Sequence, residues 1–222
     1  MSALAGLAAV GAMALGAAGA LAVAETITSS PLCCTFSKPT FTIDQGELAT
    51  YQNPGGSSHN VTATANGPDG AELFRSDTIS SGQTPVSGTQ YLTQGTYNFV
   101  CTIHPGMVAS LAVTGNGTPV PRPGVQLKVL SRKLDRVVAS RRLKVRVSAP
   151  SASDDVAITA RKGARKLGSK RGIDLSAGSS RTLKLRLTRA ARNALEDLAK
   201  AKVKVSATVP FGSPASAKRK LR

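Results

Sequence analysis

Four side chains that bind metals stand out in this sequence, because two of them are its only histidines. His59 lies in one polar stretch, and His104 lies further along between Cys101 and Met107, in the order Cys-x-x-His-x-x-Met. Thiolate and thioether sulfurs suit Cu(I), while imidazole suits both common oxidation states of copper. Two histidines and one cysteine with a weak axial methionine therefore indicate a mononuclear copper site for electron transfer.

Zinc is the alternative metal for the same residues. Zinc is usually held by cysteine, histidine and carboxylate groups, and a thioether is a poor zinc ligand. The scarcity of histidine also limits the chemistry, because enzymes with several copper ions need further histidines and a Ser-His-Asp set needs a free one. The sequence contains neither a P-loop nor a dinucleotide-binding glycine motif. We therefore predict that the protein is not an enzyme.

The residues around these ligands read as short strands separated by turns. Pro105 and Gly106 interrupt regular structure, so "TIHPGM" is expected to be a tight loop that turns its ligands toward one point. His59 then has to arrive from a different loop. The stretches that read as strands are "FTIDQGELATYQN", "HNVTATA", a short piece around Tyr91, "QGTYNFVC" and "VASLAVTG". This spacing, with no helix-length periodic segment, predicts an all-β sandwich or barrel.

The quoted segments and the Cys-x-x-His-x-x-Met spacing resemble the cupredoxin family, the small blue copper proteins related to plastocyanin and azurin. The ligand loop is most similar to the amicyanin type, the shortest of the group. The resemblance covers residues 41–115 and implies a Greek-key β-sandwich that holds one type 1 copper ion and passes single electrons to a redox partner protein. The ligands that it implies are His59, Cys101 and His104, with Met107 in the axial position.

The same resemblance assigns roles to two neighbours of the ligands. Asn60, directly after the first histidine, is expected to hydrogen-bond across the site and hold the two ligand loops together. Pro105 is expected to shape the loop around His104, whose exposed edge would be the electron port. Family members often carry a hydrophobic or acidic docking patch around this edge. Here only small or apolar neighbours are visible, so the sequence does not identify the partner.

Charge divides the chain into two parts of opposite sign. Of the 29 Lys and Arg residues, only Lys38 and Arg75 precede residue 120, and the 12 acidic residues split evenly. Two basic against six acidic residues give a net charge of −4 before that point, and 27 basic against six acidic residues give +21 after it. We expect a copper domain over residues 41–115, a Pro/Gly linker over 116–124 and a basic domain over 125–222.

The basic part reads as a second β-sandwich. Stretches such as "LKVRV" and "LKLRL" alternate aliphatic and cationic residues, which places the aliphatic side chains inward and the cations in water. Thr188 can cap one short helix from Arg189 to about Ala199. This part loosely resembles immunoglobulin-like C-terminal modules of exported actinobacterial proteins.

The basic surface leaves three interpretations open. It is a solvated cationic face, or it binds anionic envelope polymers or lipid headgroups, or it binds nucleic acid. Nucleic acid is the least favoured, because Phe211 is the only aromatic residue after Phe99 and bases would find little to stack on.

The chain begins with an apolar segment. Ala3–Ala24 contains no charged residue, and as a helix it would be about 33 Å long, enough to cross a bilayer core. It ends in Ala22-Val23-Ala24, a small-x-small pattern that suits signal peptidase. Residues 1–24 are therefore expected to form a cleaved signal peptide or an N-terminal membrane anchor, with a buried core helix as the third alternative. Either of the first two places the rest of the chain outside the cytoplasm.

Residues 25–40 are expected to form a polar connector that contains the adjacent Cys33 and Cys34. Adjacent Cα atoms lie about 3.8 Å apart, which is below the usual disulfide range of about 4.4–6.8 Å. We therefore expect free thiols or intermolecular pairing rather than a bridge between the two, and lipid attachment at Cys33 is less favoured still. The sequence as a whole predicts an exported electron carrier; the alternative is an envelope-associated copper-binding, buffering or adhesion protein.

Overall fold

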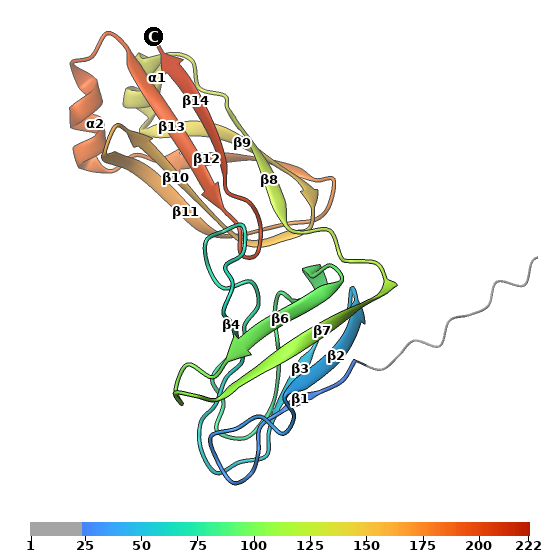
Figure 1. Cartoon of the computed structure of the whole chain (residues 1–222). Coiled ribbons are helices and arrows are strands. Elements are labelled where there is room, and N and C mark those ends of the chain that lie inside the picture. Colours follow the sequence, from blue (N-terminus) through green and yellow to red (C-terminus); the bar gives the residue numbers. More distant parts are fainter. Residues whose placement is uncertain (1–23) are drawn as a thin grey trace, which may run out of the picture.

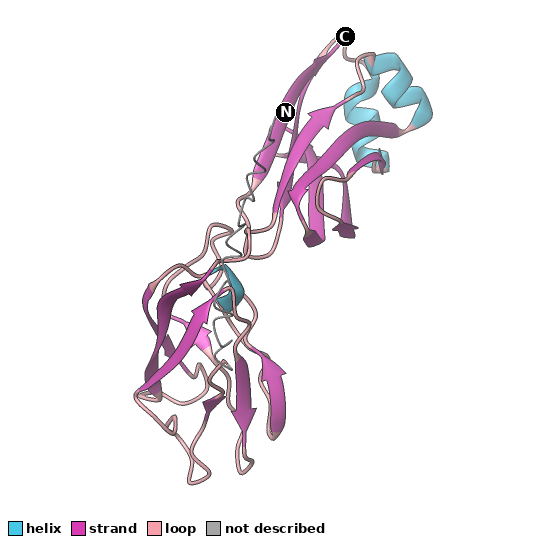
Figure 2. Ribbon diagram, turned by 90° about the vertical axis from the view of Figure 1, so that its right-hand side faces the viewer, coloured by secondary structure: helices cyan, strands magenta, loops and turns pink. Residues whose placement is uncertain are grey.

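The protein consists of two β-domains arranged end to end (Figures 1 and 2). The computed structural model describes residues 24–222. The expected N-terminal helix of residues 3–24 lies outside this part of the chain, except for Ala24. Within the described part, no helix is both long and apolar enough to cross a membrane.

The first domain is a sandwich of two sheets with short strands. One sheet has the order β1-β3-β5, and the other has the order β2-β7-β6-β4. Two neighbouring pairs, β1 with β3 and β2 with β7, run parallel, and the other pairs run antiparallel. The strands are β1 (Ile27–Thr28), β2 (Thr40–Gln45), β3 (Thr50–Asn53), β4 (Thr62–Ala63), β5 (Gly82–Pro85), β6 (Gly95–Val100) and β7 (Val108–Gly117). This arrangement confirms the predicted β-sandwich.

Two expectations for the first domain are wrong in detail. Residues 25–40 are not a free connector, because β1 pairs with β3 and both Ile27 and Phe36 are buried in the domain core. The short strand expected around Tyr91 is a 3-10 helix over Thr89–Tyr91 instead. The domain therefore begins earlier than expected.

The core of the first domain is built around aromatic rings. Phe99, fully buried on β6, lies with its ring centroid 4.8 Å from that of Phe36 and 6.2 Å from those of Phe41 and Phe74. Because Phe99 comes from the strand that ends next to Cys101, this packing fixes the base of the ligand loop.

The second domain is also a sandwich, with sheets ordered β11-β10-β13-β14 and β12-β9-β8. On β9, burial alternates strictly along "LKVRV": the aliphatic residues are buried and the cations are exposed, as predicted. The strands are β8 (Gly124–Val129), β9 (Arg142–Ser151), β10 (Ser153–Lys162), β11 (Arg165–Leu175), β12 (Ser180–Arg186), β13 (Ala201–Thr208) and β14 (Ala215–Leu221). The immunoglobulin-like resemblance of this domain stays a prediction.

The second domain has two helices where one was expected. The predicted helix is α2 (Arg189–Glu196), and Thr188 caps it by accepting a hydrogen bond from the backbone N–H of Ala191 at 3.1 Å. The additional helix is α1 (Leu134–Ser140), which buries Leu134 and Val137. These two apolar residues, three positions apart, form a stripe too short to be distinguished from a loop by periodicity.

The two domains meet around Phe211. Its ring lies 6.1 Å from that of Tyr91, and the guanidinium carbon of Arg75 lies 4.9 Å from its centroid. The backbone N–H of Phe211 donates to the carboxylate of Asp69 at 2.8 Å. Gly88 has a φ of 105°, and a Cβ there would lie 2.9 Å from the Phe211 ring, so this position requires glycine on both counts. The joint is therefore a packed contact and not a linker alone.

We predict that Phe99→Ala lowers the free energy of unfolding of the first domain by about 3–5 kcal/mol, because it removes a fully buried ring from the core. Tyrosine fluorescence during urea unfolding measures this domain selectively, since all three tyrosines lie in it and the chain has no tryptophan. Leu48→Ala, at a half-exposed site, is the control and should cost less than about 1 kcal/mol. Equal losses in the two variants would contradict the packing described here.

Candidate metal centre

Two neighbouring chain segments bring the predicted ligands together at one end of the first domain. Strands β4 and β6 pair in register, with Thr62 opposite Val100. Extending that antiparallel register beyond the strand ends brings Asn60 opposite Thr102, so the segment before β4 runs beside the segment after β6. His59 and Cys101 therefore lie close together although they are 42 residues apart.

Three potential metal-binding atoms converge here. The Cys101 sulfur lies 3.8 Å from Nδ1 of His59 and 3.7 Å from Nδ1 of His104. The ligand atoms of these residues all lie within 4.8 Å of one another, and the two imidazole centroids are 4.5 Å apart. Both histidines thus turn the same ring nitrogen toward the thiol, as a shared ion would require.

Met107 joins the site through the tight turn that the sequence predicted. The backbone N–H of Met107 donates to the carbonyl of His104 at 3.2 Å, and the N–H of Cys101 donates to the carbonyl of Met107 at 3.0 Å. These bonds close the loop, and β7 then pairs with β6 from Val108 onward. Met107 is buried, with 1% of its surface exposed. The loop therefore brings the Met107 backbone beside that of Cys101 and buries the Met107 side chain in the domain.

Asn60 ties the two ligand segments together. Its side-chain oxygen accepts a hydrogen bond from the backbone N–H of Thr102 at 2.9 Å, and its side-chain nitrogen donates to the Thr102 hydroxyl at 2.8 Å. The same nitrogen also lies 3.1 Å from the hydroxyl of Thr78. Asn60 makes the cross-site hydrogen bonds that the family resemblance implied, and it holds the histidine segment against the cysteine segment.

The surroundings of His59 favour the form that binds a metal through Nδ1. The Ser57 hydroxyl donates to the sulfur of Cys33 at 3.6 Å, so its oxygen is free to accept from Nε2–H of His59 at 2.9 Å. A proton on Nε2 leaves the Nδ1 lone pair directed toward Cys101. Burial lowers the pKa of His59, and the nearby His104 lowers it further, so the neutral imidazole is favoured.

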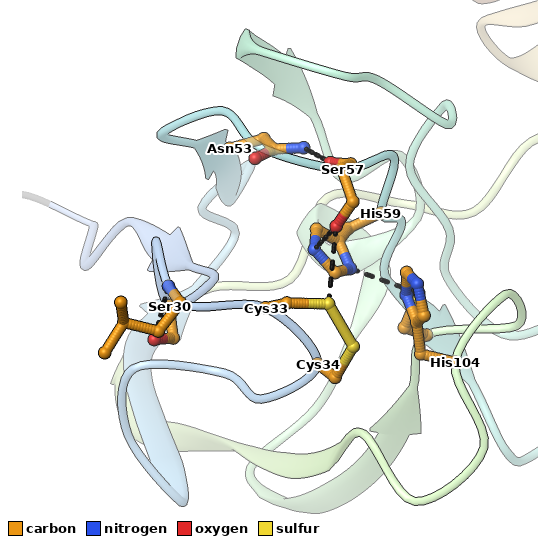
Figure 3. The surroundings of a disulfide bond; sticks show 9 residues. Ser30, Cys33, Cys34, Asn53, Ser57, His59 and His104 are labelled. Carbon is orange, nitrogen blue, oxygen red and sulfur yellow. Dashed lines mark hydrogen bonds between the residues drawn. A yellow bond between two sulfur atoms is a disulfide. The ribbon is translucent and has the colours of Figure 1, made fainter.

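Cys33 and Cys34 do not remain free thiols in the structure; they form a disulfide with each other, so our expectation was wrong (Figure 3). Both residues adopt left-handed backbone conformations, with φ values of 74° and 70°, which turn the two side chains toward one another. The disulfide sits at the tip of the loop between β1 and β2, beside His59 and His104. The N-terminal loop thus forms one wall of the site.

The exposure of the site is limited to one side. His59 and Cys101 are buried, whereas His104 is half-buried and its neighbours Ile103 and Pro105 are exposed. Pro105 lies in the tight turn between His104 and Met107, where the sequence placed it. His104 is therefore the most accessible of these three residues.

Sequence reasoning missed three polar contributors. Ser57 orients His59, and Thr78 and Thr102 receive the Asn60 amide. Serine and threonine are common in loops, so their presence in the sequence does not indicate a role at the metal centre. The register between β4 and β6 would have placed Thr102 opposite Asn60, but the sequence alone does not give this strand pairing.

Residues 23–114 match the family described as copper binding proteins, plastocyanin/azurin family. The match covers most of the first domain. None of the curated proteins compared with the chain matches it.

Part of the chain is also similar to solved structures. A mutant of amicyanin in its Cu(I) form has a TM-score of 0.34 at 23% identity, covering 40% of this chain and 81% of that chain. An oxidized mutant of amicyanin gives 0.34 at 24% identity with the same coverage. Auracyanin A, a "blue" copper protein from the green thermophilic photosynthetic bacterium Chloroflexus aurantiacus, gives 0.34 at 19% identity, covering 40% of this chain and 96% of that chain.

The donor set fits copper. One thiol, two imidazole nitrogens and a buried thioether from the same loop match the preferences of Cu(I) and Cu(II), and zinc would gain little from the thioether. Together with the family match, these donors assign copper to the centre.

We predict that Asn60→Ala weakens copper binding by about 10–100-fold, because the two ligand segments lose the hydrogen bonds that hold them together. Competition with a copper chelator measures the affinity. Asn98→Ala, which truncates an exposed asparagine on β6, is the matched control and should leave the affinity unchanged. If both variants bind copper like the parent chain, Asn60 does not hold the site together.

Proposed function

We propose that the protein is an exported type 1 copper protein that carries single electrons at the cell envelope, with His59, Cys101 and His104 as strong ligands and Met107 as the axial ligand. One observation carries this proposal: the thiol of Cys101 lies between the Nδ1 atoms of two histidines, 3.8 and 3.7 Å away. Bound copper would supply the couple between Cu(I) and Cu(II).

The residues around the ligands support electron transfer because they hold the donor atoms in place. Asn60 joins the two ligand segments, Ser57 fixes the ring of His59, and the loop that ends at Met107 is closed by backbone hydrogen bonds. Electron transfer is fast when the ligand geometry changes little between oxidation states. A site tied down in this way keeps that change small.

His104 is the proposed electron port. It is the most exposed of the histidine and cysteine ligands, and the neighbouring Ile103 has 44% of its surface exposed. A redox partner with an apolar contact surface can approach this edge, because no charged side chain of the loop from Cys101 to Met107 opposes it. Both histidines are committed to one metal ion, which supports a carrier rather than an enzyme.

The basic domain is proposed to hold the protein near anionic polymers or lipid headgroups of the envelope. One of its cationic features is an open groove of about 640 Å³ lined by Arg141, Arg186, Arg189 and Arg192, together with Leu187, Thr188 and Asn193. Clustered guanidinium groups bind phosphate and carboxylate oxygens in bidentate fashion. Export is supported by the apolar Ala3–Ala24 segment in the sequence.

The electron-carrier proposal predicts that the chain loaded with Cu(II) is intensely blue. The colour comes from the bond between copper and the Cys101 thiolate, so Cys101→Ser should lose it. Met107→Leu removes only the weak axial ligand and should keep the colour while its reduction potential shifts. Visible and electron paramagnetic resonance spectra measure the first effect, and voltammetry measures the second. A colourless parent chain, or a blue Cys101→Ser variant, would refute the proposal.

A copper-buffering or adhesion protein is the second candidate, favoured by the size and charge of the basic domain. The two functions differ in redox behaviour. A carrier cycles rapidly and reversibly on an electrode, whereas a buffer binds copper tightly and exchanges electrons slowly.

We predict that the full chain binds vesicles containing anionic phospholipid and releases them as the salt concentration rises, because a net charge of +21 after residue 120 is screened by added ions. Cosedimentation at about 0.05 M and 0.5 M salt measures the effect, and zwitterionic vesicles are the control. A soluble polyphosphate added as competitor shows whether polymers occupy the same surface. Equal binding to both vesicle types would contradict this prediction.

A further inference from the structure

The Cys33–Cys34 disulfide lies beside the copper centre without belonging to it. The two cysteines and His104 have ligand atoms that all lie within 4.8 Å of one another. The sulfur of Cys33 also accepts a hydrogen bond from Ser57, which in turn contacts His59 (Figure 3). His104 is therefore common to two clusters of potential ligands: the Cys101 cluster and the Cys33–Cys34 cluster.

The two clusters differ in accessibility. Cys101 and His59 are buried, whereas Cys33 and Cys34 are exposed at the tip of their loop. The exposed cysteines and the half-buried His104 are therefore more accessible to a metal ion from solvent than the buried Cys101. Two thiolates and one imidazole form a soft, three-coordinate set, which suits Cu(I).

We propose that, in the dithiol form, Cys33 and Cys34 form with His104 an entry site for Cu(I), from which the ion passes to the buried centre. The copper is exchanged between sulfur ligands while His104 stays bound. The disulfide form has no thiolate to offer, so copper can use this entry site only after reduction. The entry site is independent of electron transfer, and only the passage onward depends on the proposed copper centre.

The redox step needs a thiol reductant, either two small thiols or one dithiol. The reductant gives two electrons and two protons, the sulfur–sulfur bond between Cys33 and Cys34 breaks, and one disulfide forms in the reductant. Binding of Cu(I) then displaces the two thiol protons to solvent. On passage to the buried centre the two thiolates regain protons and Cys101 gives one up, while copper stays Cu(I) throughout.

The entry site is tested in the Cys101→Ser chain, where the buried centre lacks its thiolate. Anaerobic competition with a Cu(I) chelator is measured before and after treatment with a dithiol that is then removed. We expect reduction to raise the Cu(I) affinity by at least about tenfold, because two soft ligands are gained. X-ray absorption at the copper edge should detect two additional sulfur ligands after reduction. The control is the same chain with Cys33→Ser and Cys34→Ser, in which the dithiol treatment should change nothing.

Passage to the buried centre is tested by the rate of copper uptake in chains that keep Cys101. Apo protein is mixed with Cu(I), and the copper bound at the centre is measured from the blue colour after oxidation. The reduced parent chain should load at least several-fold faster than the oxidized one, and Cys33→Ser/Cys34→Ser should load slowly in both conditions, yet end equally blue. Tyrosine fluorescence verifies that this variant is folded.

The outcomes separate the two proposals. If reduction leaves both the Cu(I) affinity and the loading rate unchanged, the entry site is refuted even when the parent chain is blue. If the parent chain is not blue but reduction still creates a Cu(I) site that depends on Cys33 and Cys34, the entry site stands and the electron-carrier function fails.

Discussion

The metal centre of the first domain depends on holding together two chain segments, one before β4 and one after β6, that lie beyond the paired parts of these strands. Strand β4 is only two residues long, and its pairing with β6 stops at Thr62 and Val100, just before the ligands begin. Beyond that point the Asn60 side chain takes over from the ladder by exchanging hydrogen bonds with Thr102. An amide that both donates and accepts can imitate a backbone pair. Asn60 thus helps to fix the position of His59 relative to Cys101, together with the backbone pair between His59 and Ile79.

Packing and hydrogen bonds elsewhere in the first domain also stabilise the two ligand segments. Phe99 anchors the strand that leads to Cys101, and the turn from Cys101 to Met107 is closed by its own backbone. The site is therefore assembled at the rim of a rigid sandwich, from segments whose far ends are buried. Methionine has a flexible side chain. The packed strands hold the backbone of the ligand segments in place, so the site can keep a single geometry.

The sequence was sufficient to single out His59, Cys101 and His104, whose ligand atoms the structure brings together, because scarce histidines and a cysteine at fixed spacing leave few alternatives. It was also sufficient for the strand alternation in the basic domain, where every second residue is a cation. It failed where the outcome depends on backbone conformation. Nothing in the letters "CC" signals that both residues adopt positive φ, a conformation that non-glycine residues rarely take. Helix α1 was missed because two buried residues are too few to establish a period.

The packed joint around Phe211 has a consequence for how the molecule would present its centre. Strand β6 (Gly95–Val100) starts shortly after Tyr91, which lies at the joint, and ends just before Cys101. The copper centre therefore lies at the end of the first domain that is remote from the basic domain (Figure 1). If the basic domain binds a charged surface, the contact around Phe211 sets the orientation of the first domain relative to that surface. In that orientation the second domain separates His104 from the charged surface, and His104 is accessible to partners that approach from the opposite side.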